Sequence, residues 1–225
     1  MTAAALLALG SALLHAGWNL IVKAGRDPFV FIWAVFASST VVGIPVLIAL
    51  GWPPAEAWPY ILGSSLLQLI YVFTLSAAYR TTDLSVAYPI ARGLAPLLIT
   101  VGAWLALDDA LGVVPLLGVL LVSLSLMSIA RGSGGGSGVG WALATGITVA
   151  GYTLIDTAGV RRVDESIRYV AALFVTVALL TTVALLLTRS KRLVIELVRT
   201  NGIRMLVSGS LAIGAYGLVL IAARL

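Results

Sequence analysis

The chain has 225 residues, of which 60% are hydrophobic and 10% are charged, and its formal net charge is +5. Soluble domains carry roughly 25% charged residues, so this composition excludes an ordinary soluble protein and indicates an integral membrane protein surrounded by lipid. With no cysteine and one histidine, disulfides and thiolate or multi-histidine metal sites are excluded within one chain, and we expect no cofactor. Basic residues stand mainly between apolar runs, where they orient a chain in the bilayer rather than bind nucleic acid.

Apolar runs long enough to cross a bilayer occur eight times, since a membrane-spanning helix needs about 20 mostly apolar residues. The sequence therefore predicts an all-α, polytopic helix bundle. Its spans are expected at residues 3–23, 28–50, 60–79, 84–107, 111–130, 139–160, 167–187 and 203–223. No basic residue precedes the first run and no obvious cleavage site follows it, so a removable signal peptide is the weaker interpretation. Between the last two spans, residues 193–198 are expected to form a short helix on the membrane surface.

Two matches within the chain predict an internal repeat. Residues 15–25 share six of eleven identities with residues 149–159 at an offset of 134, and six residues between 65 and 78 recur between 210 and 223 at an offset of 145. The second match includes Tyr71 and Tyr216. Small residues at intervals of four on the first and sixth spans also predict close helix packing. These are Ala8, Ala12 and Ala16, and Ala142, Gly146 and Ala150.

The repeat predicts the domain organisation. Residues 1–131 form a first repeat of five spans, the glycine- and serine-rich residues 132–138 form a flexible linker, and residues 139–225 form a second repeat with three spans. Because five is odd, the second copy begins on the opposite side of the membrane and is inverted, which is typical of transporters. Residues 81–130 have no counterpart before Leu225, so we expect eight spans of a ten-span design, with the second repeat truncated.

Several motifs lie around the fourth span, namely Tyr79-Arg80, Ala87-Tyr-Pro-Ile90, Ala95-Pro-Leu-Leu98 and Leu107-Asp-Asp-Ala-Leu-Gly112. They resemble the EamA-type transporters of the drug/metabolite transporter superfamily, and His15-Ala-Gly-Trp-Asn19 with Lys23 resembles the first helix of one EamA-like branch. Asp108 and Asp109 stand where the family typically carries Gly-Glu. The resemblance covers nearly the whole chain. It implies two inverted five-helix halves around a central cavity, alternating access, a place in the bacterial inner membrane, and no enzymatic activity.

Arg92 is the first candidate site residue, because a guanidinium inside a span stays charged and must face protein or water. Tyr88 precedes it by four residues on the fourth span, and Tyr152 and Asp156 have the same spacing on the sixth, so each pair shares a helix face. Asp156 is the expected partner of Arg92. The alternative for this pair is a structural ion pair that locks the two halves together.

The first and third spans supply further candidates. His15, Asn19 and Lys23 recur every four residues on one face of the first span, and Trp18 borders that face. They either line a polar cavity, or His15 and Asn19 hydrogen-bond a neighbouring helix while Lys23 reaches the membrane interface. Gln68 and Tyr71 on the third span are candidates for the cavity or for packing.

A cavity that contains Arg92, His15 and Lys23 with one acid is net positive, which favours an anionic or carboxylate-bearing substrate, and His15 could couple transport to protons. We therefore expect a secondary transporter that moves a small polar or amphipathic metabolite by alternating access, as an exporter. The sequence leaves the oligomeric state open, with a homodimer as one option. The alternatives are a lipid-modifying membrane enzyme, which usually shows acidic or histidine clusters at the interface, and a non-transporting subunit or incomplete fragment.

Overall fold

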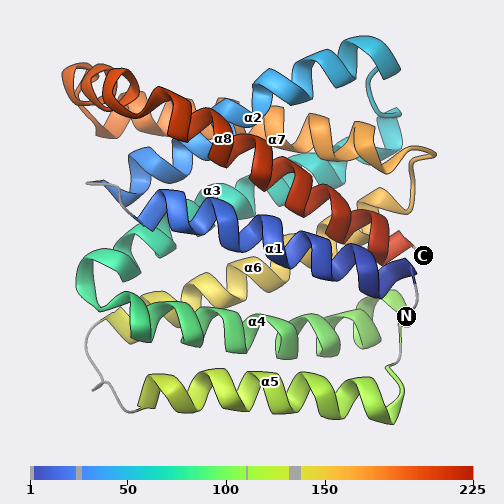
Figure 1. Cartoon of the computed structure of the whole chain (residues 1–225). Helices are drawn as coiled ribbons and strands as arrows, with labels where there is room; N and C mark the ends of the chain where they lie inside the picture. Colours follow the sequence, from blue (N-terminus) through green and yellow to red (C-terminus); the bar gives the residue numbers. More distant parts are fainter. Residues whose placement is uncertain (1–2, 24–26, 110, 132–137, 225) are drawn as a thin grey trace. The chain divides into compact units, whose positions relative to one another are not determined.

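The computed structural model describes residues 3–23, 27–109, 111–131 and 138–224. Within these residues the chain forms eight α-helices, one short 3₁₀ turn and no strand, which confirms the predicted all-α class (Figure 1). The elements are α1 (Ala3–Lys23), α2 (Pro28–Leu50), η1 (Ala55–Ala57), α3 (Trp58–Thr81), α4 (Leu84–Leu107), α5 (Val113–Arg131), α6 (Gly138–Val160), α7 (Ser166–Thr188) and α8 (Lys191–Arg224).

Six of these helices are long and apolar enough to cross a membrane, namely α2, α3, α4, α6, α7 and α8. The chain is therefore an integral membrane protein. Shorter apolar helices, Ala3–Trp18 and Val113–Ser128, lie within α1 and α5, so the first and fifth spans stay predictions. On α5, Val113, Val114 and Leu121 are largely exposed, as expected of side chains that face lipid.

The segment 193–198 is helical, but the prediction of a separate surface helix is wrong. It forms the beginning of α8, which continues without a break for 34 residues. Gly202 costs the helix only about 1 kcal/mol relative to alanine, which is too little to end it. The Thr200 hydroxyl donates to the carbonyl of Glu196 at 2.9 Å, a contact that bends helices, and Figure 1 shows the first turns of α8 pointing in another direction from the rest.

The chain divides into two compact units. One comprises Met1–Leu66 with Asp156–Leu225, and the other comprises Leu67–Ile155. The first unit holds α1, α2, α7 and α8, the second holds α4 and α5, and α3 and α6 contribute to both. The predicted linker lies almost entirely outside the described residues, so the division into two sequence repeats stays a prediction.

In the first unit, α1 and α8 lie side by side and antiparallel (Figure 1). Glycines bring them close: a Cβ on Gly17 would lie 3.3 Å from Leu211, and one on Gly214 would lie 3.4 Å from Leu14. Between them, the buried Ser11 hydroxyl donates to a backbone carbonyl of α8 at 2.7 Å. Close approach combined with an interhelical hydrogen bond is a common way for helices to associate in lipid.

The predicted small-residue faces have different outcomes on the two helices. On α6 the face is buried, and Gly146 packs against Leu94 of α4, where an added Cβ would lie 3.1 Å from its side chain. On α1, α8 packs on the face that contains the glycines and the alanine face is exposed in the described structure, so close packing on the alanine face stays a prediction. The exposed residues are Ala8, Ala12 and Ala16.

A second antiparallel pair in the same unit is formed by α2 and α7. The rings of Phe36 and Phe174 lie 5.6 Å apart. The indole Nε1 of Trp33 donates to the Thr182 hydroxyl at 2.8 Å. The pair therefore combines aromatic packing with a satisfied polar contact between helices.

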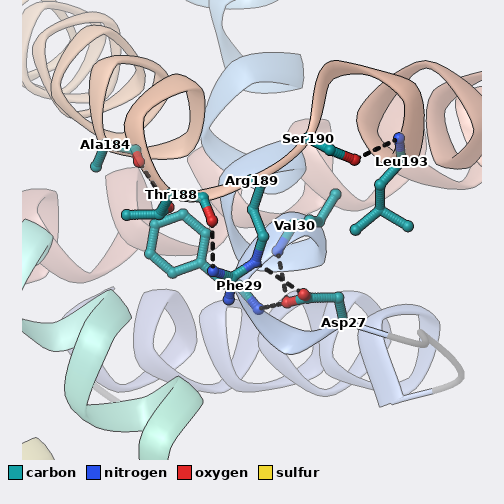
Figure 2. Close-up of polar contacts among 8 residues, drawn as sticks. All are labelled: Asp27, Phe29, Val30, Ala184, Thr188, Arg189, Ser190 and Leu193. Carbon is teal, nitrogen blue, oxygen red and sulfur yellow. Dashed lines mark hydrogen bonds and ion pairs between the residues drawn. The ribbon is translucent and has the colours of Figure 1, made fainter.

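Asp27 joins the beginning of α2 to the end of α7 (Figure 2). One carboxylate oxygen caps α2 by accepting hydrogen bonds from the backbone N–H groups of Phe29 at 2.9 Å and Val30 at 3.4 Å. The other oxygen accepts from Nε of Arg189 at 2.9 Å. The side chains of Arg189 and Asp27 are only 19% and 15% exposed, and the guanidinium also lies 5.2 Å from the centre of the Phe29 ring.

We expect Asp27→Ala to destabilise the protein more than Asp27→Asn. Asparagine caps helices as well as aspartate does, so the asparagine variant loses only the ion pair, whereas alanine also loses about 1 kcal/mol of capping. Thermal unfolding in detergent measures the difference. Asp83 is a matched control, because it stands at the N-cap of α4 and makes no capping hydrogen bond there. Equal losses for Asp27→Ala and Asp27→Asn would contradict a role for the cap.

Candidate functional site

Arg92 lies within α4, a helix long and apolar enough to cross the membrane. Pro89 and Pro96 stand on either side of it, and each removes one backbone hydrogen bond from the helix. The Arg92 side chain is half-buried, and its guanidinium lies 5.4 Å from the centre of the Tyr88 ring, in cation–π contact. Tyr88 and Arg92, which were predicted to share one face of this helix, are therefore in contact in the structure.

Three more tyrosines complete the Arg92 cluster, which we define as Arg92, Tyr71, Tyr79, Tyr88 and Tyr152. Tyr71 and Tyr79 of α3 and Tyr152 of α6 all interact electrostatically with the guanidinium. The rings of Tyr71 and Tyr152 meet edge to face at 5.8 Å. All five residues belong to the second compact unit. Together the five side chains carry one positive charge and four neutral hydroxyls, a set suited to binding a carboxylate or phosphate.

The sequence analysis found four of these five residues and missed Tyr79. A signal was available, because Tyr79 follows Tyr71 by eight residues and so lies two turns along the same face of α3. Gln68, the other candidate on α3, is buried in the same unit and makes polar interactions of its own.

Asp156 lies near the end of α6 in the first compact unit and is 0% exposed. The Tyr169 hydroxyl of α7 donates to its Oδ1 at 2.8 Å, and the Tyr216 hydroxyl of α8 donates to its Oδ2. The Ser64 hydroxyl of α3 hydrogen-bonds the same carboxylate. These four residues form the Asp156 cluster. Sequence analysis had singled out Tyr216 only as the repeat counterpart of Tyr71, and it missed Ser64 and Tyr169.

The expected ion pair between Arg92 and Asp156 stays a prediction. The two residues belong to different compact units, and the structure gives each a set of tyrosine neighbours. Helix α6 contributes to both clusters, since Tyr152 and Asp156 lie one turn apart on it.

The candidates on α1 are described in part. His15 and Trp18 meet edge to face, with ring centres 4.9 Å apart, and the Trp18 side chain is buried. Asn19 and Lys23 belong to α1, but their side chains lie outside the described residues. The polar face of the first span therefore stays a prediction, and so does the place of Trp18 at its border.

Two pairs of adjacent acids, Asp108-Asp109 and Asp164-Glu165, bear on the alternative of a membrane enzyme, and both lie at helix ends. Asp108 ends α4 in the left-handed conformation, with φ 56°, which aspartate tolerates better than most residues. Glu165 stands before α7 and pairs with Arg168 at 3.2 Å on the exposed surface. Across the described residues, no group of three or more His, Asp or Glu side chains could hold a metal ion.

Comparison with known proteins identifies the fold and no family. The chain matches no family model and no curated protein. A solved structure described as "Crystal structure of protein" is similar over 98% of this chain and 79% of its own length, with a TM-score of 0.74 and 19% sequence identity. At this identity the similarity shows a shared fold alone. The resemblance to EamA-type transporters therefore rests on the sequence motifs.

Proposed function

We propose that this chain is a secondary transporter of the EamA type that moves a small anionic or carboxylate-bearing metabolite across the bacterial inner membrane by alternating access. The observation that carries the proposal is the Arg92 cluster. An arginine at the centre of a spanning helix costs about 3 kcal/mol on insertion scales, and such residues mark substrate pathways by default. The half-buried guanidinium among four tyrosines fits that role.

The chemistry of the cluster favours an anionic substrate. The planar guanidinium of Arg92 can hold a carboxylate or phosphate through two parallel hydrogen bonds. The tyrosines add hydroxyl donors, and their rings offer apolar surface to the rest of a metabolite. Pro89 and Pro96 lie inside the continuous helix α4 on either side of Arg92, where each removes one backbone hydrogen bond.

Packing between α2 and α7 supports the inverted repeat. The N-cap residues of the two helices are Asp27 and Glu165, which are 138 positions apart in the sequence. When the helices are aligned at this offset, Phe36 is equivalent to Phe174. In a pair related by a two-fold axis, equivalent residues on the axis contact each other, and these two rings lie 5.6 Å apart. The antiparallel direction of the two helices also agrees with inversion.

Packing on α1 and α6 supports the ten-helix architecture. Gly17 of α1 packs against Leu211 of α8, and its repeat counterpart Gly151 of α6 packs against Leu67 of α3. On α6 the small-residue face is covered by α4 at Gly146, whereas the equivalent face of α1 is exposed. In two complete repeats, a ninth helix equivalent to α4 covers that face.

Counterflow in proteoliposomes tests the proposal. The purified protein is reconstituted, the vesicles are loaded with a mixture of unlabelled metabolites, and labelled acidic, neutral and basic solutes are added outside. We expect saturable accumulation of at least one small acid, inhibited by other carboxylates and absent from protein-free vesicles. Accumulation of basic solutes alone would contradict the anionic substrate, and absence of counterflow for every class would contradict transport.

A further inference from the structure

The Asp156 cluster has no part in the proposed binding of an anion, yet it places a carboxyl group out of contact with water. Asp156 and Ser64 are 0% exposed, and so is Tyr169. Burying a carboxylate is costly unless its oxygens are satisfied. Here the partners come from three different helices, because Ser64 belongs to α3, Tyr169 to α7 and Tyr216 to α8. A fully buried acid whose partners come from three helices is a candidate for a functional role as well as a packing role.

The chemical nature of the partners indicates that purpose. The partners that the structure describes for Asp156 are hydroxyl groups. A hydroxyl can donate a hydrogen bond to a carboxylate and can also accept a hydrogen bond from the O–H of a neutral carboxyl. Lysine or arginine partners can only donate, so they would satisfy the ionised form alone. The cluster can therefore satisfy Asp156 in both charge states when the hydroxyl hydrogens rotate.

The cluster lies close in sequence to the loop after α6, and contacts between neighbouring side chains extend toward that loop. Asp156 lies four residues before Val160, the last residue of α6. Tyr60 of α3 interacts with Tyr169, and the guanidinium of the exposed Arg162 lies 4.9 Å from the centre of the Tyr60 ring. The titratable and charged groups around Asp156 on the elements packed against it are thus Tyr60, Tyr169 and Tyr216, with Arg162 at the edge.

We propose that Asp156 is the proton-binding residue of this protein, taking up one proton from the aqueous phase and releasing it during each transport cycle. On uptake, an O–H bond of a hydronium ion breaks, an O–H bond forms on one carboxylate oxygen, and water is left; release is the reverse step. A hydroxyl that donated a hydrogen bond to the carboxylate then accepts a hydrogen bond from the neutral carboxyl group, so the links from α6 to α7 and α8 depend on the charge state of Asp156. This inference rests on the proposed transport function, for which it names the coupling ion.

Infrared difference spectroscopy tests the proposal on the purified full chain. A protonated carboxyl in an apolar site gives its own C=O stretching band, so spectra taken at acidic and alkaline pH should differ by that band. We expect the band in the native protein, its loss in Asp156→Asn, and its retention in Glu56→Gln. Glu56 is a matched control, because it is an exposed acid in η1.

A second variant keeps the test decisive if Asp156→Asn does not fold. Tyr216→Phe leaves the carboxyl in place and removes one of its hydrogen bonds, so the frequency of the band should shift. A band that neither variant changes would overturn the proposal, and so would a band that added sodium suppresses, because the site would then bind a metal cation. The measurement uses no substrate. A titrating band without anion counterflow therefore supports proton binding while contradicting the transport proposal.

Discussion

Replacing Arg92 by alanine should lower the initial rate of anion counterflow about 100-fold. A bidentate, charge-assisted contact to a carboxylate is worth about 3 kcal/mol, which corresponds to roughly that factor. Arg92→Lys keeps the charge and loses the planar fork, so we expect an intermediate loss of about tenfold. The measurement is the counterflow assay, with equal amounts of reconstituted protein in every sample.

Two controls separate binding from structure in this experiment. Arg80→Ala removes the same charge from an exposed position in the last turn of α3, and its counterflow should equal that of the native protein. Thermal unfolding of Arg92→Ala addresses the alternative of a structural ion pair. Breaking a buried pair costs about 3–5 kcal/mol, whereas removing a functional charge from a membrane span should leave stability unchanged or raise it. Strong destabilisation with residual counterflow would favour the ion pair.

Gly209→Ala should destabilise the protein by about 3 kcal/mol or more. A Cβ at this position of α8 would lie 2.5 Å from Cβ of Ser38 and 2.7 Å from both the Ser39 nitrogen and the Val35 oxygen. Two of these atoms belong to the backbone of α2, which cannot move aside as a flexible side chain can. Overpacking in proteins typically costs 1–3 kcal/mol, occasionally more, and backbone contacts place this case at the upper end. The Ser39 hydroxyl, which donates to the Gly209 carbonyl at 2.8 Å, would also be displaced.

Gly202→Ala is the matched control on the same helix. No atom lies within 4 Å of a Cβ built there, so the substitution should stabilise α8 by about 0.5–1 kcal/mol through helix propensity alone. If packing against α2 causes the loss at Gly209, thermal unfolding in one detergent should show a lower midpoint for Gly209→Ala and a higher midpoint for Gly202→Ala than for the native protein. Losses of the same size at both positions would show instead that α8 tolerates no alanine, and would contradict the packing argument.

The local sequence determined the helices and most of their ends. Runs of about 20 apolar residues are long enough to satisfy every backbone group inside lipid as a helix, and α2 and α4 begin and end where the composition predicts. Asp27 and Pro28 set the start of α2, because one supplies a cap and the other a backbone already suited to the first turn. The face shared by Tyr88 and Arg92 was also predictable, since spacing along one helix fixes it.

Tertiary packing decided which faces meet and which side chains share a site. Both faces of α1 carry small residues, and only the fit of Leu14 and Leu211 against glycines selects the face that α8 covers. Tyr216 lies 60 residues from Asp156 in the chain, and Tyr169 approaches Asp156 from the next helix. Helical spacing places residues within one helix only, so the membership of the Asp156 cluster follows from how α3, α6, α7 and α8 pack together.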